Sequence, residues 1–236
     1  MYRKIFSLLT AMVCIASISN AQTTVKDKPR FGHDIPSFSL GIGLGLGSYN
    51  FDNINHQLAV HGCPQLQNNM LAMNFNFVIA HAGEPLFVDV SGGGSTYTTT
   101  TNNISLHQTV ATSEVSLNYF IVNRGRNRFY AGLGFGQMIA DAAFTTNEDG
   151  QTFLSSTVLF QGERPYRLQT AYYIDPRIGY DFQLDKRGFF YLGAKAAYRI
   201  GLNNKDWGLQ FNALSAAPKT NASGFNLSAN ITLKLS

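Results

Sequence analysis

The sequence predicts an all-β fold, an eight-stranded antiparallel up-and-down transmembrane β-barrel, and three observations support this prediction. Apolar and polar residues alternate in eight segments of the 236-residue chain. Charged residues make up only 14% of the sequence, against roughly 25% in soluble domains, while 44% of residues are hydrophobic. The connections between the segments alternate between long and short. Because mean hydropathy is only −0.06, the apolar residues are dispersed among polar ones rather than gathered into membrane-spanning helices.

The first 21 residues have the pattern of a secretory signal. Arg3 and Lys4 form a positive end, an apolar stretch covers residues 5–18, and small residues lead to a cleavage site after Ala21. A buried N-terminal helix and a lipoprotein signal are less favoured alternatives for this segment.

Removal of residues 1–21 defines the expected domain organisation. Residues 22–36 form a periplasmic N-terminal segment and residues 37–236 form the barrel. Cys63 remains as the only cysteine, so no disulfide holds the mature chain together. The 18 basic residues fall to 16 against 14 acidic ones, and this balance indicates no nucleic-acid partner.

The first four segments each place an apolar row opposite a small or polar row, as a strand with two unlike faces requires. In residues 37–47, Phe, Leu and Ile alternate with serine and glycine. In residues 71–79, large apolar residues alternate with alanine, asparagine and valine. Residues 86–91 set leucine and valine against phenylalanine, aspartate and serine, and residues 114–121 set apolar residues against glutamate, serine and asparagine.

The last four segments repeat the pattern. Residues 129–136 alternate apolar residues with glycine, and residues 177–184 oppose apolar residues to arginine, glycine, aspartate and glutamine. Residues 190–201 and 225–235 carry six apolar residues each, opposite small, polar and basic ones. Most segments approach the roughly 9–11 residues with which a tilted strand crosses a bilayer.

Polarity decides between a membrane barrel and a soluble barrel or sandwich, because a soluble barrel places charges outside. The non-apolar faces here hold mostly glycine, serine and asparagine, with few ions. We therefore expect the apolar rows to face lipid and the ions to pair inside the barrel as a structural network. The expected network consists of Asp89, Glu114, Asp175, Arg177, Asp181, Lys195, Arg199 and Lys234.

The connections alternate as those of outer-membrane barrels do, with short periplasmic turns and longer extracellular loops. Short turns are expected around residues 81–84, 123–127 and 185–188. Long loops are expected at residues 48–68, 92–108, 145–164 and 203–224. An even number of strands places both barrel termini on the periplasmic side.

Aromatic residues gather where two membrane interfaces are expected, as in the aromatic girdles of such barrels. The predicted girdle near the short turns contains Phe77, Tyr119, Phe129, Phe182 and Phe190. The predicted girdle near the long loops contains Tyr49, Phe51, Phe144, Tyr172 and Phe225.

Two short sequence segments resemble those of a known group of proteins. They are Phe-Tyr-Ala-Gly-Leu-Gly at 129–134 and Phe-Phe-Tyr-Leu-Gly-Ala at 189–194, each directly after a short turn. With the strand pattern of residues 35–236, the chain resembles small bacterial outer-membrane β-barrels of the OmpA/OmpX-like superfamily, especially the Bacteroidota-type "outer membrane protein beta-barrel" and PorT-like group. Such barrels often end in an aromatic residue, whereas this chain ends in Leu235 and Ser236.

The sequence offers weak candidates for chemistry, and we expect no catalytic residue, cofactor or metal. A hydrolase needs a serine, a histidine base and a carboxylate, and His107 lies near Ser105, Ser113 and Glu114 in sequence. Chance proximity is the favoured interpretation. His56, His61 and Cys63 are metal-ligand types without an evident fourth ligand.

Apolar residues within the long loops are a candidate partner surface: Phe153, Leu154, Phe160, Trp207 and Phe211. Extension of the strands above the membrane is the favoured alternative for these residues.

The sequence therefore predicts an integral outer-membrane protein with a structural or surface-interaction role and a plugged polar interior. Alternatives are a narrow channel or transporter for a small solute or apolar molecule, a lipid A-modifying enzyme, and a PorT-like secretion component. The expected partners are outer-membrane lipid, lipopolysaccharide and a protein or surface ligand at the loops. We expect a monomer.

Overall fold

The computed structural model describes residues 36–60, 62–81, 85–146, 166–168, 170–208 and 219–235. The chain divides into two compact units after His33, and every described residue belongs to the second. The predicted signal segment, and the N-terminal segment except Pro36, lie outside the described residues.

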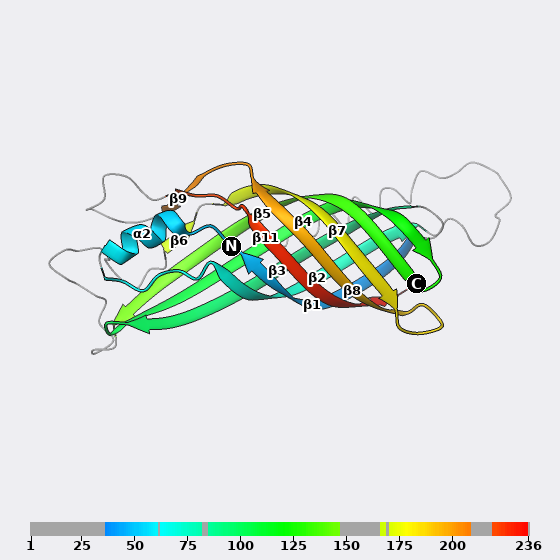
Figure 1. Cartoon of the computed structure of the whole chain (residues 1–236), viewed down its shortest axis with the longest axis horizontal. Coiled ribbons are helices and arrows are strands. Elements are labelled where there is room, and N and C mark those ends of the chain that lie inside the picture. The colour runs from blue at the N-terminus through cyan, green and yellow to red at the C-terminus, as the bar shows by residue number, and fades with distance from the viewer. Residues whose placement is uncertain are drawn as a thin grey trace. The chain divides into compact units, whose positions relative to one another are not determined.

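Eight long strands form a closed antiparallel barrel, which confirms the predicted fold class (Figure 1). They are β1 (Pro36–Ser48), β2 (Asn69–His81), β3 (Leu86–Thr101), β4 (Ile104–Arg124), β5 (Asn127–Thr146), β7 (Ala171–Gln183), β8 (Phe190–Gly201) and β11 (Gly224–Lys234). The last strand, β11, pairs with the first, β1, from Ser39↔Lys234 to Gly47↔Asn226. This pairing closes the ring, so the barrel has no open edge along that seam.

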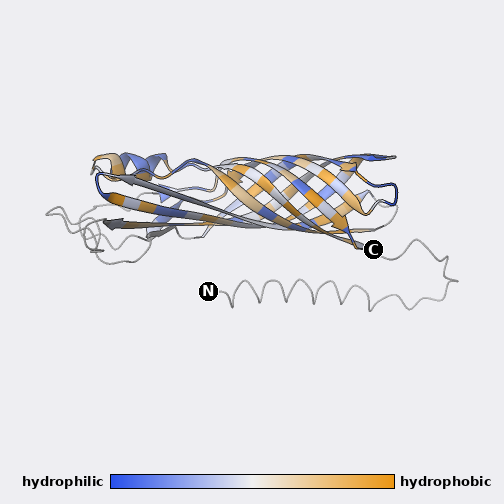
Figure 2. Cartoon of the chain, turned by 90° about the horizontal axis from the view of Figure 1, so that it is seen from below, coloured by the Kyte–Doolittle hydropathy of each residue, from blue (hydrophilic) through white to orange (hydrophobic). Residues whose placement is uncertain are grey.

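The apolar rows face outward, as the sequence predicts. Leu40, Ile42, Leu44 and Leu46 of β1 are each at least half exposed, and the residues between them are partly or fully buried. Figure 2 shows hydrophobic and hydrophilic residues alternating along the strands of the barrel wall. An outward apolar band around a polar interior is the arrangement of a transmembrane barrel.

The connection between β3 and β4 is a tight hairpin, so the predicted long loop at 92–108 is wrong. The two strands pair without interruption to Thr101↔Ile104. The turn residues Asn102 and Asn103 have φ values of 50° and 61°, in the left-handed region that two-residue hairpin turns require and that asparagine tolerates. The threonine run before them is β-branched, and such residues favour strands over loops.

Three short strands extend the wall at the opposite end from the short turns, which we call the long-loop end. They are β6 (Tyr166–Leu168), β9 (Lys205–Gly208) and β10 (Lys219–Thr220). Strand β6 pairs with β5 at Asp141 and Ala142, β9 pairs with β6, and β10 pairs with β9. The predicted loop at 203–224 therefore contains two of these strands, and most of the predicted loop at 145–164 lies outside the described residues.

The connection between β1 and β2 contains a helix, α2 (Asp52–Val60), which lies at the long-loop end (Figure 1). It contacts β10 and buries Ile54 and Leu58. Among the described residues no helix is both long enough and apolar enough to cross a membrane.

A charge on the outward row is expected to destabilise the barrel. Leu44 is 54% exposed and pairs with Met73 and Ala229 near the middle of the wall. Leu44→Lys should cost about 2–4 kcal/mol, the range for a lysine facing lipid near the bilayer midplane. Urea unfolding in lipid vesicles, followed by the gel mobility of folded and unfolded chain, measures this loss.

The matched control is Val60→Lys in α2, where the side chain is 70% exposed. This substitution should leave the unfolding midpoint unchanged because the site faces water. Equal effects of the two substitutions would contradict a lipid-facing position for Leu44.

Candidate functional site in the barrel interior

A buried cluster around Arg177 crosses the interior between three strands. The guanidinium of Arg177 on β7 donates to Glu114 on β4 and to Asp175 Oδ2 at 2.9 Å. It also lies 3.9 Å from Asp89 Oδ2 on β3, and its Nη1 donates to Ser116 Oγ at 2.9 Å. The Arg177 side chain is fully buried, so this one cation holds three carboxylates together away from bulk water.

Local sequence makes room for the cluster. A Cβ at Gly134 on β5 would lie 2.5 Å from Arg177 Nη2 and 2.9 Å from the Glu114 carboxyl carbon. Only glycine therefore lets the guanidinium reach across the neighbouring strand. The ladder from β7 to β8 skips Asp175 and Pro176 and resumes at Arg177, because proline has no N–H to donate.

The structure brings together only part of the predicted ion network. Asp89, Glu114, Asp175 and Arg177 form the cluster described above. Among the described residues, no ion pair within 4.0 Å joins the other four predicted members, which are Asp181, Lys195, Arg199 and Lys234. In the part of the chain that the structure describes, ion pairs therefore join only four of the eight expected members, because sequence gives the strand face of each charge but not its height in the barrel.

Arg199 on β8 interacts with carbonyls and aromatic rings instead of a carboxylate. Its Nη2 donates to the carbonyl oxygens of Ser48 and Phe225, the first where β1 ends. Its guanidinium lies 4.7 Å from the ring centre of Tyr49 and 5.9 Å from that of Tyr173, which are cation–π distances. Arg199 thus ties β8 to the start of the β1–β2 connection and closes the interior above the Arg177 cluster.

A small polar cavity of about 110 Å³ lies within the barrel toward the short-turn end. Asp89, Tyr130, Asp181 and Arg128 line it, together with Lys234 and asparagine side chains of β2 and β11. The guanidinium of Arg128 lies 4.2 Å from the centre of the Tyr191 ring. The cavity has the polarity and size to hold a few waters.

The long-loop end of the interior is filled by an apolar cluster, which we call the cap. It consists of Tyr49, Phe51, Ile54, Leu58, Cys63, Leu66, Met70, Ile104, Leu106, Val110, Met138, Ala140, Ala142, Phe144, Ala171, Tyr173, Trp207 and Ala222. Phe51 and Leu106 are completely buried. Burial in this cluster raises the pKa of the Cys63 thiol.

Side-chain amides satisfy the backbone groups of Leu66 and Gln67 where the segment 62–68 enters the cap. Gln108 on β4 accepts from Gln67 N at 2.7 Å and donates to Gln67 O at 3.2 Å. Asn55 on α2 accepts from Leu66 N at 2.7 Å and donates to Leu66 O at 2.9 Å. Each amide makes, for one residue, the two backbone hydrogen bonds that a neighbouring strand would otherwise make. An irregular connection can therefore be buried inside the barrel mouth.

The cap changes the interpretation of several aromatic residues. Tyr49, Phe51 and Phe144 are buried in the cap, so their prediction as a lipid-facing girdle is wrong, whereas Tyr172 and Phe225 are exposed. The alternation already separates them: continued from β1 and β5, Tyr49, Phe51 and Phe144 fall on the inward row, whereas Tyr172 and Phe225 fall on the outward rows of β7 and β11.

Of the residues predicted to form a loop surface, only Trp207 lies among the described residues, and it is buried. Trp207 is 1% exposed, packs its ring edge-on against Phe51 and donates from Nε1 to Thr220 Oγ1 at 3.0 Å. It belongs to strand β9 and is not an exposed loop side chain. Phe153, Leu154, Phe160 and Phe211 fall outside the described residues.

The catalytic candidates do not form a triad. On β4, Glu114 is buried with Arg177, whereas His107 lies on the opposite, exposed row and contacts Thr98 Oγ1 through Nδ1 at 3.1 Å. Ser105 and Ser113 share the outer row with His107. In the described ranges no three His, Cys, Asp or Glu side chains are grouped as metal ligands, and His61 lies outside them.

Comparison with solved structures identifies similar barrels. The outer membrane protein OprG from Pseudomonas aeruginosa matches with a TM-score of 0.54 and 13% identity, over 86% of this chain and 98% of that one. Neisserial surface protein A matches with a TM-score of 0.50 and 10% identity, over 86% of this chain and 99% of that one. No family model matches the chain, and no curated protein matches significantly. At this identity the likeness establishes the fold, a small eight-stranded barrel of the outer-membrane type.

Removal of the central cation should destabilise the barrel strongly. Arg177→Met leaves three carboxylates without their shared partner, and we expect a loss of about 3–5 kcal/mol in unfolding free energy. Urea titration in vesicles measures the loss. In the Arg177→Met background, Glu114→Gln should restore part of the stability because it removes one uncompensated charge.

Lys219→Met is the matched control, because this lysine is exposed at the long-loop end. It should leave the unfolding curve where it is. A mild effect of Arg177→Met, equal to that of the control, would contradict the central role of the cluster.

Proposed function

We propose that this chain is an integral protein of the bacterial outer membrane with a structural or surface-interaction role. In this proposal the barrel anchors a rigid platform, made of the cap and the extended hairpin of β3 and β4, at the cell surface. The outward apolar band and the likeness to an outer-membrane protein and to a surface protein support the location. The exposed face of α2 and the hairpin turn at Asn102 and Asn103 are available to a ligand.

The observation that carries the proposed role is the doubly blocked interior. The Arg177 cluster spans the barrel between β3, β4 and β7, and the cap fills the long-loop end with buried apolar side chains. A hydrated ion needs a continuous aqueous path, which neither the ion cluster nor the apolar cap offers. An eight-stranded barrel is also just wide enough for side chains to fill it.

Planar-bilayer recording tests the blocked interior against the transport alternative. The wild-type chain should insert and show no conductance steps, because both barriers lie in series. Heat-modifiable gel mobility of the same preparation verifies that the barrel is folded. Recurrent single-channel steps with folded wild-type protein would contradict the plug and favour a narrow channel.

The orientation and processing of the chain are part of the proposal. We propose that residues 1–21 are removed on export, that the three short turns face the periplasm, and that the cap faces the outside. Short connections at one end, and long ones between β1 and β2, β5 and β7, and β8 and β11 at the other end, support this orientation. Monomeric barrels in contact with lipopolysaccharide, with the long loops as partner surface, complete the proposal; the PorT-like assignment stays a prediction from the two short sequence segments.

Cysteine labelling on intact cells tests the location and the orientation together. A membrane-impermeant maleimide should label Val60→Cys in the exposed face of α2 but not Lys186→Cys in the turn between β7 and β8. Both variants should be labelled after lysis. Cys63 contributes little background because the thiol is buried and its pKa is raised. Labelling of Lys186→Cys alone in intact cells would reverse the orientation.

A further inference from the structure

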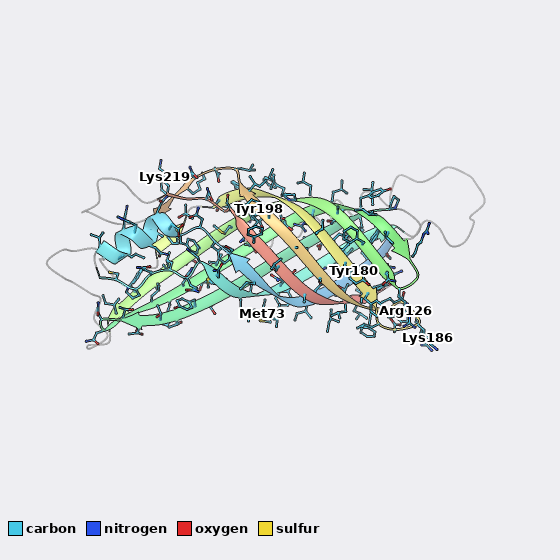
Figure 3. All side chains as sticks on the ribbon, in the orientation of Figure 1. Met73, Arg126, Tyr180, Lys186, Tyr198 and Lys219 are labelled. Atoms are coloured by element: carbon cyan, nitrogen blue, oxygen red, sulfur yellow. The ribbon has the colours of Figure 1, made fainter. Side chains whose placement is uncertain are left out.

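Two neighbouring turns at the short-turn end form one basic surface. Arg124 ends β4 and Arg126 lies in the turn between β4 and β5, and the turn between β7 and β8 contains Lys186 and Arg187. Strands β5 and β7 are paired, and Gln183 N donates to Arg126 O at 2.8 Å, which holds the two turns side by side. In Figure 3 the side chains of Arg126 and Lys186 extend from the same end of the barrel.

The four cations of this surface, which we call the basic rim, are not neutralised locally. All four are exposed, and within the described residues none of them forms an ion pair. Asp185, the one acid in these turns, accepts from Phe190 N at 2.9 Å and from Arg187 N at 3.0 Å. These N–H groups, that of Phe190 foremost, lower the pKa of Asp185, so its carboxylate stays ionised and fixes the turn. The four cations of the basic rim and the carboxylate of Asp185 together carry a net charge of +3.

The depth of the basic rim matches that of lipid phosphate. Val122 on β4 and Leu184 after β7 are exposed apolar side chains next to the turns, and Phe190 begins the outward row of β8. Arg124, Lys186 and Arg187 lie two or three residues beyond such an apolar side chain, and Arg126 lies three residues before Phe129 on the outward row of β5. With a rise of about 3.4 Å per residue on a strand tilted by about 40°, this places the cations about 5–8 Å past the apolar band. The headgroup zone occupies about the same thickness on each side of the hydrocarbon.

Within the described residues, the opposite end of the barrel has no such surface. Among the described residues there, the cations Lys205 and Lys219 are accompanied by Asp52 and Asp206. Figure 3 shows Lys219 at the end away from Arg126 and Lys186. The charge of the described residues is therefore asymmetric along the barrel axis, with the positive excess at one membrane interface.

We propose that the basic rim binds the phosphate of an anionic phospholipid, such as phosphatidylglycerol, in the leaflet at the short-turn end. Arginine side chains offer paired N–H donors that fit phosphate oxygens, and lysine adds a mobile point charge. The apolar side chains beside the turns contact the acyl chains of the same lipid. This role goes beyond the proposed function and requires only that the barrel spans a bilayer.

Lipid enrichment around the full-length chain tests the proposal. The protein is reconstituted in nine parts phosphatidylcholine to one part phosphatidylglycerol, extracted in mild detergent, and analysed for bound lipid by native mass spectrometry. Wild-type barrel should carry phosphatidylglycerol above its share of the mixture. Arg126→Gln with Lys186→Gln should reduce the preference about fivefold for each cation removed and about 25-fold together. High salt should reduce the wild-type preference as well.

The matched control is Lys205→Gln with Lys219→Gln, which removes the same charge from the other end and should leave the preference unchanged. Heat-modifiable mobility verifies folding of each variant. Bulk lipid composition around the wild type, or an unchanged preference in the Arg126 and Lys186 variant, would overturn the proposal. Binding to isolated peptidoglycan that depends on these two residues, without phosphatidylglycerol enrichment, would also overturn it and assign the basic rim to a cell-wall polyanion.

Discussion

Closure of the hydrogen-bonded sheet is the constraint from which the other features of this barrel follow. Lipid offers no hydrogen bonds to a backbone, so each strand must have a neighbour on both sides where it crosses the hydrocarbon. The closing pair joins Leu44 to Ala229, residues near opposite ends of the barrel sequence. Once the ring is closed, the two-residue period of a strand decides which way each side chain of the wall points. One row faces lipid and the other row shares a narrow interior.

The narrow interior explains both its glycines and its charges. Small residues such as Gly134 leave space that the long side chain of Arg177 occupies from a neighbouring strand. Water is displaced there, and the carboxylates of Asp89, Glu114 and Asp175 gather within 4 Å of the guanidinium of Arg177. Gly136 likewise leaves room for a side chain of a neighbouring strand, because a Cβ there would collide with the ring of Tyr173. Polar groups thus fill the barrel instead of leaving an open pore.

Beyond the membrane-spanning part, at the long-loop end, the interior of the barrel is apolar instead of polar. The strands β3, β4 and β5 continue beyond their neighbours, and the β1–β2 connection folds into the mouth that they leave open. There the interior row becomes apolar, as Leu106 and Val110 on β4 show, and water replaces lipid outside. The cap is thus a small soluble-type core built on a membrane-type wall, with Arg199 and its aromatic neighbours at the junction.

Sequence alone determined the strand number, the faces of each strand and the outward apolar band, because these depend on local alternation. It placed Arg177 and Glu114 in the interior for the same reason. The tertiary structure decided which charges meet, since the relative height of strands follows from the register of the closed ring. It also decided that Trp207 packs against Phe51 inside the cap, because the sequence pattern assigns no partner to a residue in a predicted loop. It decided too that the threonine run before Asn102 is strand, because these residues pair with β4.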